Sequence, residues 1–336
     1  MKPSDPIVRV FRGAITESIH RFHLAVVNTE GTLLHQAGDP HLLTFARSTA
    51  KLIQALPVIE SGAADHFGLG DAEIALCCAS HNGEAEHVST AQGILGKLGF
   101  THEHLQCGAH DPYHAPTAQA MREKGIAPTT LHNNCSGKHS GMLALAAHLH
   151  AAPETYMSIQ HPVQQLMLEA VCGMSGVPKD QMHLGIDGCG VPVFGMPIDR
   201  LALAFARLGS PAALAEARAS ACRRIVAAVQ KYPQFLAGSD RFDTRLIEVT
   251  GGRIVGKMGA EGIFALTIPE QGIGFVLKVE DGNQRAMYPA VVETLKQLGL
   301  LKESEVSALA FFHTPAVHNW QGTEVGRIQP DFNFQP

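Results

Sequence analysis

A serine and a lysine that could react together, Ser48 and Lys51, stand three positions apart in the chain. Residues three apart on a helix share one face, so the lysine amine can reach the serine oxygen. A neutral amine in that place takes the hydroxyl proton as the oxygen attacks a carbonyl carbon, which makes the serine a nucleophile. The alternative is an N-cap serine followed by a solvated lysine, which would leave a charge on a helix whose other residues face a core.

Two further short motifs follow in a meaningful order. Ser80 belongs to an S-x-N motif after an apolar run, and Lys257 begins a K-x-G motif in a strand-like stretch. Serine β-lactamases and penicillin-binding proteins line one site with S-x-x-K, S-x-N and K-x-G in this order. The order therefore predicts a serine-hydrolase site. For Ser80 alone, a local hydrogen bond at the end of a strand is the alternative.

A third group of residues predicts a metal site. Cys135 and Lys138 would share a helical face, and Cys189 adds a second thiol from a glycine-rich turn. Two thiolates and one nitrogen suit Zn²⁺, with water or substrate as the fourth ligand. A neutral lysine costs roughly 4–5 kcal/mol at pH 7, which a zinc site worth ~10–16 kcal/mol offsets. His81 and His139 are alternative nitrogen ligands, and two core cysteines without metal are the simpler interpretation.

The remaining cysteines predict no disulfide framework. The chain has seven cysteines, an odd number, and no C-x-x-C motif. Free cysteine packs well in cores, so most of them are expected to be buried. A rival metal cluster, Cys107 with His110 and His114, lies in a polar stretch with no second thiol, so it suits zinc less well.

Alternating strands and helices are expected to position these residues. Residues 8–11, 23–27, 32–35, 73–79, 253–256, 262–268 and 273–279 have strand patterns, and residues 48–60, 90–98, 136–150, 211–231 and 284–298 have helical ones. Pro57 predicts a kink or early stop in the first helix, and residues 185–195 predict a loop that holds Cys189. No repeat or linker interrupts this order, so one domain over residues 1–336 is the prediction.

The composition excludes several classes of protein. The 336 residues are 45% hydrophobic and 17% charged, which favours a large core over disorder. A net charge of −5 gives no reason to expect a nucleic-acid partner. The sequence has no apolar run of ~18 residues that would cross a membrane. Its first residues lack the pattern of a secretory signal, so a cytoplasmic location is expected.

Taken together, the motifs resemble the rhizobial-type asparaginase II family. They are ARSTAK (46–51), CASH (78–81), NCSGKH (134–139), DGC (187–189), GKMGA (256–260) and KVEDGN (278–283). The match runs in order from about residue 8 to residue 310 and so covers nearly the whole chain. As a set these motifs are highly specific, and this family is unrelated to the common bacterial asparaginases with a threonine nucleophile.

The resemblance implies a fold, an activity and a site. The fold would be a mixed α/β fold like that of serine β-lactamases, with a central antiparallel-rich sheet flanked by helices, in a homodimer. The enzyme would hydrolyse L-asparagine to L-aspartate and ammonia through an ester on Ser48. The family's site residues match two Ser-Lys tandems, Ser48–Lys51 and Ser80–Lys257, a Zn²⁺ site at Cys135, Lys138 and Cys189, and Asp187 to orient a water molecule. The resemblance also implies Arg47, His81 and His139 as substrate-binding or supporting residues.

Three other functions remain open at the level of the sequence. A β-lactamase or D-Ala peptidase would use the same motif order, but its substrates lie outside the cytoplasm. A non-catalytic zinc protein would use Cys135 and Cys189 as a structural clamp. A reversible thiol sensor would leave the same two thiols free of metal.

Overall fold

The computed structural model describes residues 6–334, whose largest element is an antiparallel sheet. Its eight strands follow the order β10-β11-β1-β2-β9-β8-β7, and β3 pairs with β2 beside this path. The strands are β1 (Ile7–Arg12), β2 (Ile15–Val27), β3 (Leu33–Ala37), β7 (Val255–Gly259), β8 (Ile263–Ile268), β9 (Ile273–Val279), β10 (Ala316–His318) and β11 (Glu324–Asp331). A second sheet has the order β4-β6-β5, from β4 (Leu43–Phe45), β5 (His183–Ile186) and β6 (Pro192–Pro197).

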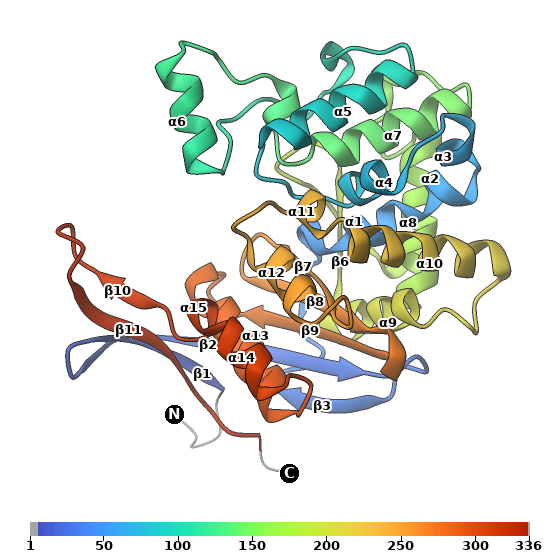
Figure 1. Ribbon diagram of the computed structural model, residues 1–336. Helices are drawn as coiled ribbons and strands as arrows, with labels where there is room; N and C mark the ends of the chain where they lie inside the picture. The colour runs from blue at the N-terminus through green and yellow to red at the C-terminus, as the bar shows by residue number, and fades with distance from the viewer. Residues whose placement is uncertain (1–5, 335–336) are drawn as a thin grey trace.

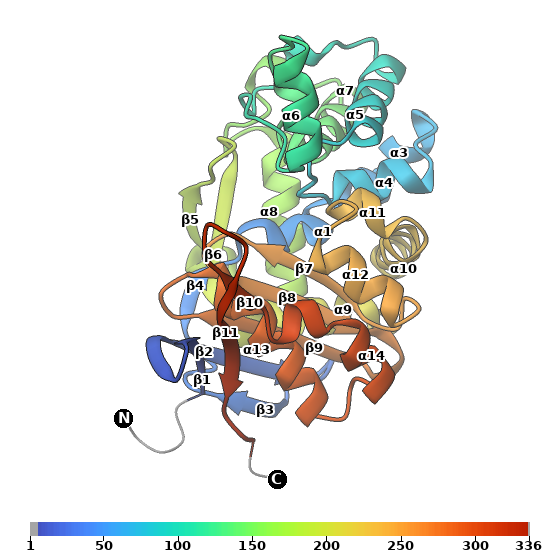
Figure 2. The ribbon, with the colours of Figure 1, turned by 60° about the vertical axis from the view of Figure 1, so that its left-hand side comes forward.

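Helices cover both faces of the large sheet and form a separate helical layer (Figures 1 and 2). The helices before β5 are α1 (Lys51–Gln54), α2 (Leu56–Glu60), α3 (Ala63–His66), α4 (Asp71–Cys77), α5 (Ala85–Lys97), α6 (Ala115–Glu123), α7 (Ser136–His148) and α8 (Pro162–Ser175). The later ones are α9 (Ile198–Gly209), α10 (Glu216–Lys231), α11 (Pro233–Leu236), α12 (Phe242–Val249), α13 (Gln284–Gln297), α14 (Glu303–Ala308) and α15 (Ala310–His313).

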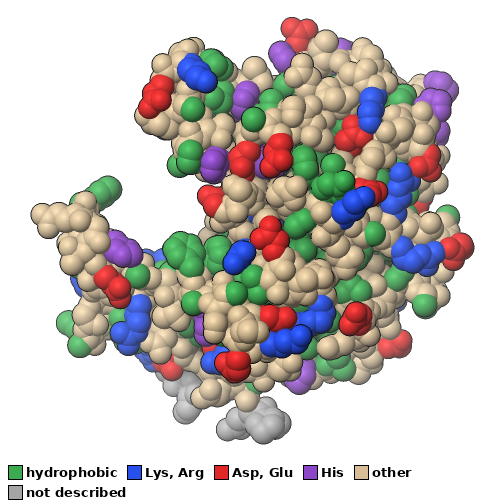
Figure 3. All heavy atoms as spheres, viewed as in Figure 1, with side chains coloured by type: hydrophobic (Ala, Val, Ile, Leu, Met, Phe, Trp, Pro, Cys, Tyr) green, Lys and Arg blue, Asp and Glu red, His purple; other side chains and the backbone are tan. Residues whose placement is uncertain are grey.

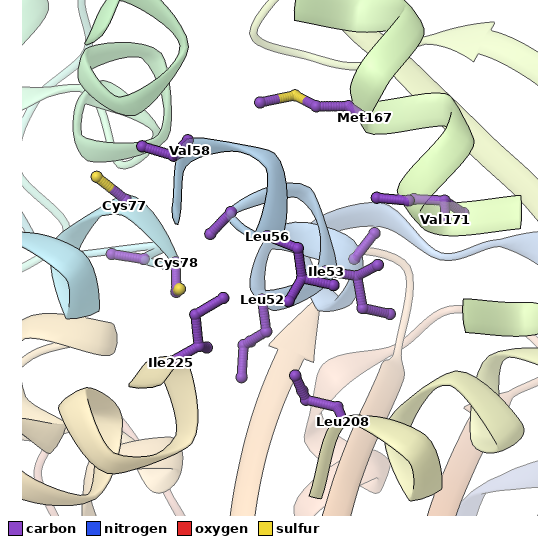
Figure 4. Packing of buried hydrophobic residues seen from close by; sticks show 14 of the residues in the cluster. Leu52, Ile53, Leu56, Val58, Cys77, Cys78, Met167, Val171, Leu208 and Ile225 are labelled. Atoms are coloured by element: carbon purple, nitrogen blue, oxygen red, sulfur yellow. The ribbon is translucent and has the colours of Figure 1, made fainter. Parts of the chain in front are cut away.

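Two hydrophobic cores hold these layers together. One lies between the sheet and helices α12 and α13, where Phe264 and Phe275 meet Phe242 and Met287. The other joins α9 on the opposite face to the helical layer. Figure 4 shows α1 at the centre of this second core, with Leu52 contributing to the packing. The helix that carries Lys51 is therefore fixed by apolar packing.

The fold confirms the expected antiparallel sheet flanked by helices, in a mixed α/β protein. The strands expected near residues 8–11, 23–27, 32–35, 262–268 and 273–279 are present, and so are the helices near 90–98, 136–150, 211–231 and 284–298. Their bounds differ by a few residues at most ends. No helix within residues 6–334 is long and apolar enough to cross a membrane.

One expected element is wrong. Residues 73–79 were expected to form a buried strand, but Asp71–Cys77 is helix α4. The backbone N–H of Gly70 donates to Glu73 Oε2 at 2.8 Å, which caps the first turn of this helix. Acidic residues in a first turn favour a helix, while a short apolar run alone does not separate a buried helix from a strand.

The helix expected over residues 48–60 is broken into three pieces. A 3₁₀ turn (Arg47–Ala50) precedes α1, and α2 begins after a break at Ala55. The break lies two residues before Pro57, which has no backbone N–H to continue a helical ladder. The expected effect of Pro57 is therefore confirmed.

Candidate active site

The two serines singled out by the sequence line one cavity. It has a volume of about 470 Å³ and lies between the helical layer and the sheet. Its lining consists of Ser48, Ser80, Tyr113, Asn134, Arg241, Met258, Ala260, Gln284 and Tyr288. On the face drawn in Figure 3, the surface is also hollowed between α6 and the β10–β11 hairpin.

Three different segments fix Ser80 beside this cavity. It follows α4 in the chain, and its backbone N–H donates to Leu236 O at 3.0 Å. The next N–H, that of His81, donates to Asn134 O at 3.1 Å. Ser80 is thus held between α11 and the start of α7, and only 2% of it is exposed.

Lys51 is buried behind the cavity wall, with three hydrogen-bond acceptors around its amine. Its Nζ donates to Ala79 O at 2.6 Å, to Ser80 Oγ at 2.8 Å and to Cys135 Sγ at 3.1 Å. The amine therefore connects the serine-hydroxyl side of the site with the thiol side.

Lys257 is a second buried amine, placed by strand β7. Its Nζ donates to Met258 O at 2.9 Å and lies 3.6 Å from Asp243 Oδ1, with both side chains fully buried. Burial lowers the pKa of Lys257 to about 7, although the Asp243 carboxylate opposes this and the cations of Lys51 and Arg241 add to it. An amine with this pKa gains and loses its proton near neutral pH.

The two predicted thiols and Lys138 meet in one buried cluster. Lys138 Nζ donates to Cys189 Sγ at 3.0 Å, and the Cys135 and Cys189 thiols are hydrogen-bonded to each other. The hydrogen bond from Cys189 and the nearby lysines hold the pKa of Cys135 below its usual range despite burial. That same hydrogen bond and burial raise the pKa of Cys189. The two thiols therefore differ in acidity, with the lower pKa on Cys135.

Local structure explains why these donors converge. The backbone N–H of Cys135 donates to Asn133 Oδ1 at 2.8 Å just before α7 begins, which places Lys138 in the first turn of that helix. Cys189 sits in the tight turn between β5 and β6, where Gly190 adopts a φ of +88°. Glycine adopts such a conformation at low cost.

Arg47 and Asp187 form an ion pair near the thiol cluster, with Nε 3.0 Å from Oδ1. Burial alone would raise the pKa of Asp187, but Lys138, the Gly188 N–H and Arg47 together lower it below its usual value. Arg47 has a φ of +48°, which is rare for a residue other than glycine. Strained backbone of this kind is concentrated at functional sites.

His81 and His139 lie in the protein interior and do not line the cavity. His81 Nε2 is 2.8 Å from Ser136 Oγ, and His139 Nδ1 is 2.6 Å from the Tyr156 hydroxyl. Burial lowers the pKa of both imidazoles well below the usual range, so both are neutral. These contacts suit a supporting role more than direct contact with a ligand.

The structure brings Ser48, Ser80, Lys51, Lys257 and the thiol cluster into one region. The hydroxyl–amine hydrogen bond found among residues 6–334 joins Ser80 to Lys51. The expected couples, Ser48 with Lys51 and Ser80 with Lys257, share no such bond in the same part of the chain. The amines instead influence each other electrostatically across the site. The structure groups the two serines and the two amines as expected. The hydroxyl and amine that bond to each other, however, are those of Ser80 and Lys51 rather than those of the expected couples.

A comparison with known protein families shows which family this chain belongs to. The family model for L-asparaginase II matches residues 8–330. The chain belongs to the L-asparaginase II family. Membership confirms the resemblance found in the motifs and makes the protein an amidohydrolase of the asparaginase class, EC 3.5.1.1. No curated protein matches the chain closely enough to count as a relative.

Several solved structures are distantly similar to this L-asparaginase II family member. A β-lactamase from Mycobacterium bovis is 15% identical, with 87% of this chain and 95% of that chain covered and a TM-score of 0.40. A β-lactamase from Sphaerobacter thermophilus is 15% identical, with 84% and 93% covered and a TM-score of 0.40. A D-alanine carboxypeptidase from Burkholderia cenocepacia is 14% identical, with 87% and 92% covered and a TM-score of 0.38. These likenesses are distant.

The structure adds residues to the asparaginase site that the sequence motifs did not assign. Arg241 and Tyr288 line the cavity, and Asp243 pairs with Lys257 behind it. Arg241 and Asp243 stand two positions apart just at the start of α12, far from every motif in the chain. Charged residues are common at the start of a helix. The sequence alone therefore did not mark Arg241 and Asp243 as site residues, and the fold was needed to find them.

Proposed function

We propose that this L-asparaginase II family member hydrolyses L-asparagine to L-aspartate and ammonia, with Ser48 as the nucleophile. The observation that carries the proposal is one cavity lined by both serines, with two buried lysine amines at its wall. In the first step Ser48 Oγ bonds to the side-chain amide carbon. Lys51, as general base, accepts the hydroxyl proton. A proton then passes to the amide nitrogen, so that the C–N bond breaks and ammonia leaves.

The second half of the reaction returns the enzyme to its starting state. Water attacks the β-aspartyl ester on Ser48, aspartate is released, and Ser48 regains a proton. Ser80 already bonds to Lys51, and Lys257 has a pKa of about 7. These residues therefore form the route by which protons reach the leaving ammonia and return to the serine.

The donors at the thiol cluster fit Zn²⁺. Two thiols and one amine converge there, all at most 6% exposed, and sulfur with nitrogen is the donor set zinc prefers. Cys135, Lys138 and Cys189 would hold the ion, and Asp187 lies near enough to Lys138 to act on its charge. When bound, zinc would supply a Lewis acid or an anchor for substrate.

Zinc measurement in purified protein tests this part of the proposal. The wild type is expected to contain about one zinc ion per chain, and Cys189→Ser is expected to lose it. Cys222→Ser is the matched control, because Cys222 is a fully buried thiol in α10. Zinc that stays bound to Cys189→Ser would remove this cluster as the site.

Ammonia release tests the reaction itself. Wild type should release ammonia from asparagine, and Ser48→Ala should lower kcat/KM by at least about 10³-fold because no ester can form. Glutamine should be a poorer substrate, although one extra methylene by itself costs only about 1–3 kcal/mol. A chromogenic β-lactam should remain uncleaved. Full activity of Ser48→Ala on asparagine would exclude Ser48 as the nucleophile, while cleavage of the β-lactam alone would favour the peptidase-like alternative.

A further inference from the structure

The cavity beside the two serines has one charged side chain in its lining, that of Arg241. The other lining residues are hydroxyl, amide, apolar and aromatic side chains. Lys51 and Lys257 are at most 1% exposed and point to acceptors in the protein. A negatively charged group on a small substrate in this cavity would therefore meet Arg241 as its cation.

Neutral partners hold the guanidinium in place. Its Nη1 donates to Asn82 Oδ1 at 3.0 Å, and the Tyr288 phenol lies beside it in the cavity lining. Asn82 is itself buried and donates from Nδ2 to Asp240 Oδ1 at 2.6 Å, which fixes the amide orientation. A guanidinium held by an amide and a phenol keeps its remaining N–H donors and its charge for a ligand.

The carboxylates near Arg241 do not neutralise it by direct contact. Asp240 is engaged with Asn82, and Asp243 is engaged with Lys257 and with the Met258 N–H. Neither forms an ion pair with Arg241 in the described part of the chain. Both act on it at longer range. The two carboxylates therefore favour the charged form of the Arg241 guanidinium, but they do not occupy the N–H donors that a ligand would use.

Arg47, the arginine favoured by the sequence motifs, is placed differently. Its Nε is 3.0 Å from Asp187 Oδ1 and its Nη1 is 3.7 Å from Glu261 Oε1. It is not part of the cavity lining. A guanidinium already paired with carboxylates has less to offer an anionic ligand than one held by neutral groups.

We propose that Arg241 binds the α-carboxylate of the amino-acid substrate, with Asn82 and Tyr288 as the residues that position it. The assignment rests on the proposed function, because it takes the substrate to be a free amino acid whose side-chain amide faces Ser48. It makes the enzyme selective for amides that carry a carboxylate at the far end of a short chain.

Three amides and one variant test the assignment. L-Asparagine carries both α groups, succinamate lacks the α-amino group, and β-alaninamide lacks the α-carboxylate. Arg241→Met should lower kcat/KM roughly 10- to 100-fold for asparagine and for succinamate, the loss expected for a hydrogen bond to a charged group. Its effect on β-alaninamide should be much smaller, because that amide has no carboxylate to lose contact with.

Two further variants serve as controls. Arg241→Lys keeps the charge without the bidentate geometry and should recover part of the loss. Arg245→Met removes an exposed arginine one turn later in α12 and should leave all three rates unchanged. Equal losses of Arg241→Met on all three amides would show a structural role and overturn the assignment, as would full activity on asparagine.

A binding measurement separates this assignment from the proposed reaction. Calorimetric titration with L-aspartate needs no turnover, and Arg241→Met should weaken its binding about tenfold or more, while Arg245→Met should not. Aspartate that binds both variants equally would overturn the role of Arg241. Wild type that binds aspartate through Arg241 but releases no ammonia from asparagine would instead contradict the proposed function alone.

Discussion

At the scale of residues, the site is governed by the cost of burying charge. Three lysines are almost completely enclosed, and each has a different compensation. Lys51 has three acceptors, and Lys138 has the thiols. Lys257 has the Met258 carbonyl at 2.9 Å and one carboxylate at 3.6 Å. Burying an amine without full compensation lowers its pKa. Of the three, Lys257 is the amine whose pKa is lowered by burial to about 7.

The Lys257–Asp243 pair predicts a pH dependence. The groups that act on Lys257 are Asp243 from α12, which raises its pKa, and Lys51 and Arg241, which lower it, with Cys135 opposing them. A base must be neutral to accept a proton, so kcat/KM should rise as the pH passes through about 7. Asp243→Asn removes a negative charge beside Lys257 and so lowers the pKa of Lys257 further. The rise in kcat/KM should therefore move to lower pH.

The pH profile of kcat/KM for asparagine in wild type and Asp243→Asn provides the check. Asparagine at this position still offers an oxygen to the Met258 N–H, which Asp243 Oδ1 accepts at 2.7 Å in the wild type. Glu248→Gln removes a charge from the exposed face of the same helix, and the rise in kcat/KM should stay at the same pH. If the rise in kcat/KM stays at the same pH or moves to higher pH in Asp243→Asn, Lys257 is not part of the proton route.

Sequence reasoning named residues that the structure brings together, but not the hydrogen bonds between them. Ser48 and Ser80 do share a cavity, and Cys135, Lys138 and Cys189 do converge. The i to i+3 spacing predicted contact between Ser48 and Lys51, yet the amine bonds to Ser80. Residues three apart still share a face in the 3₁₀ turn of residues 47–50. The Lys51 amine instead reaches Ala79 O, Ser80 Oγ and Cys135 Sγ, acceptors from distant parts of the chain that local spacing does not reveal.

At the scale of elements, the close packing of α7 on α4 sets the position of the thiol cluster. A Cβ added at Gly137 would lie 2.2 Å from Leu76 O, a backbone atom of α4 that cannot give way easily. Gly137 stands between Cys135 and Lys138, so any displacement of this turn moves both. The glycine is required here by the close approach of two helices.

A matched pair of glycine substitutions tests this contact. Gly137→Ala should destabilise the fold by about 2 kcal/mol or more through overpacking and should reduce activity. Gly96→Ala, in the exposed part of α5 with open space around its Cβ position, should stabilise it by about 0.5–1 kcal/mol. Urea unfolding followed by circular dichroism measures both. Gly137→Ala with unchanged stability would mean that α7 and α4 are farther apart than the structure has them.

Element prediction failed where periodicity is ambiguous. Residues 73–79 are apolar enough for either a buried strand or a buried helix, and the deciding signal was the capping by Glu73 at the start of α4. By contrast, β8 and β9 were predicted nearly to their ends, because turn residues bound continuous buried runs. Local signals thus located strands such as β8 and β9 but missed helices such as α8 and α9, and they gave no element's neighbours.

At the scale of the whole molecule, the site exists because the topology joins distant segments. Ser48, Ser80, Arg241 and Tyr288 come from four separate parts of the chain and line one cavity between the sheet and the helical layer. The strand order of the sheet and the partners of each helix could not be derived from local periodicity, since they depend on contacts between residues far apart in the chain. The resemblance to a family supplied the architecture that periodicity did not. The single domain, the homodimer and the cytoplasmic location stay predictions.

The proposed reaction requires an aspartyl ester to form on Ser48 during turnover. The most direct measurement is intact-protein mass spectrometry of enzyme quenched in acid while it turns over asparagine, followed by peptide mapping. Turnover through Ser48 should give a species heavier by one aspartyl group, with the added mass on the peptide that contains Ser48 and no such species in Ser48→Ala. The same added mass on a peptide containing Ser80 but not Ser48, or an aspartyl adduct retained by Ser48→Ala, would contradict it.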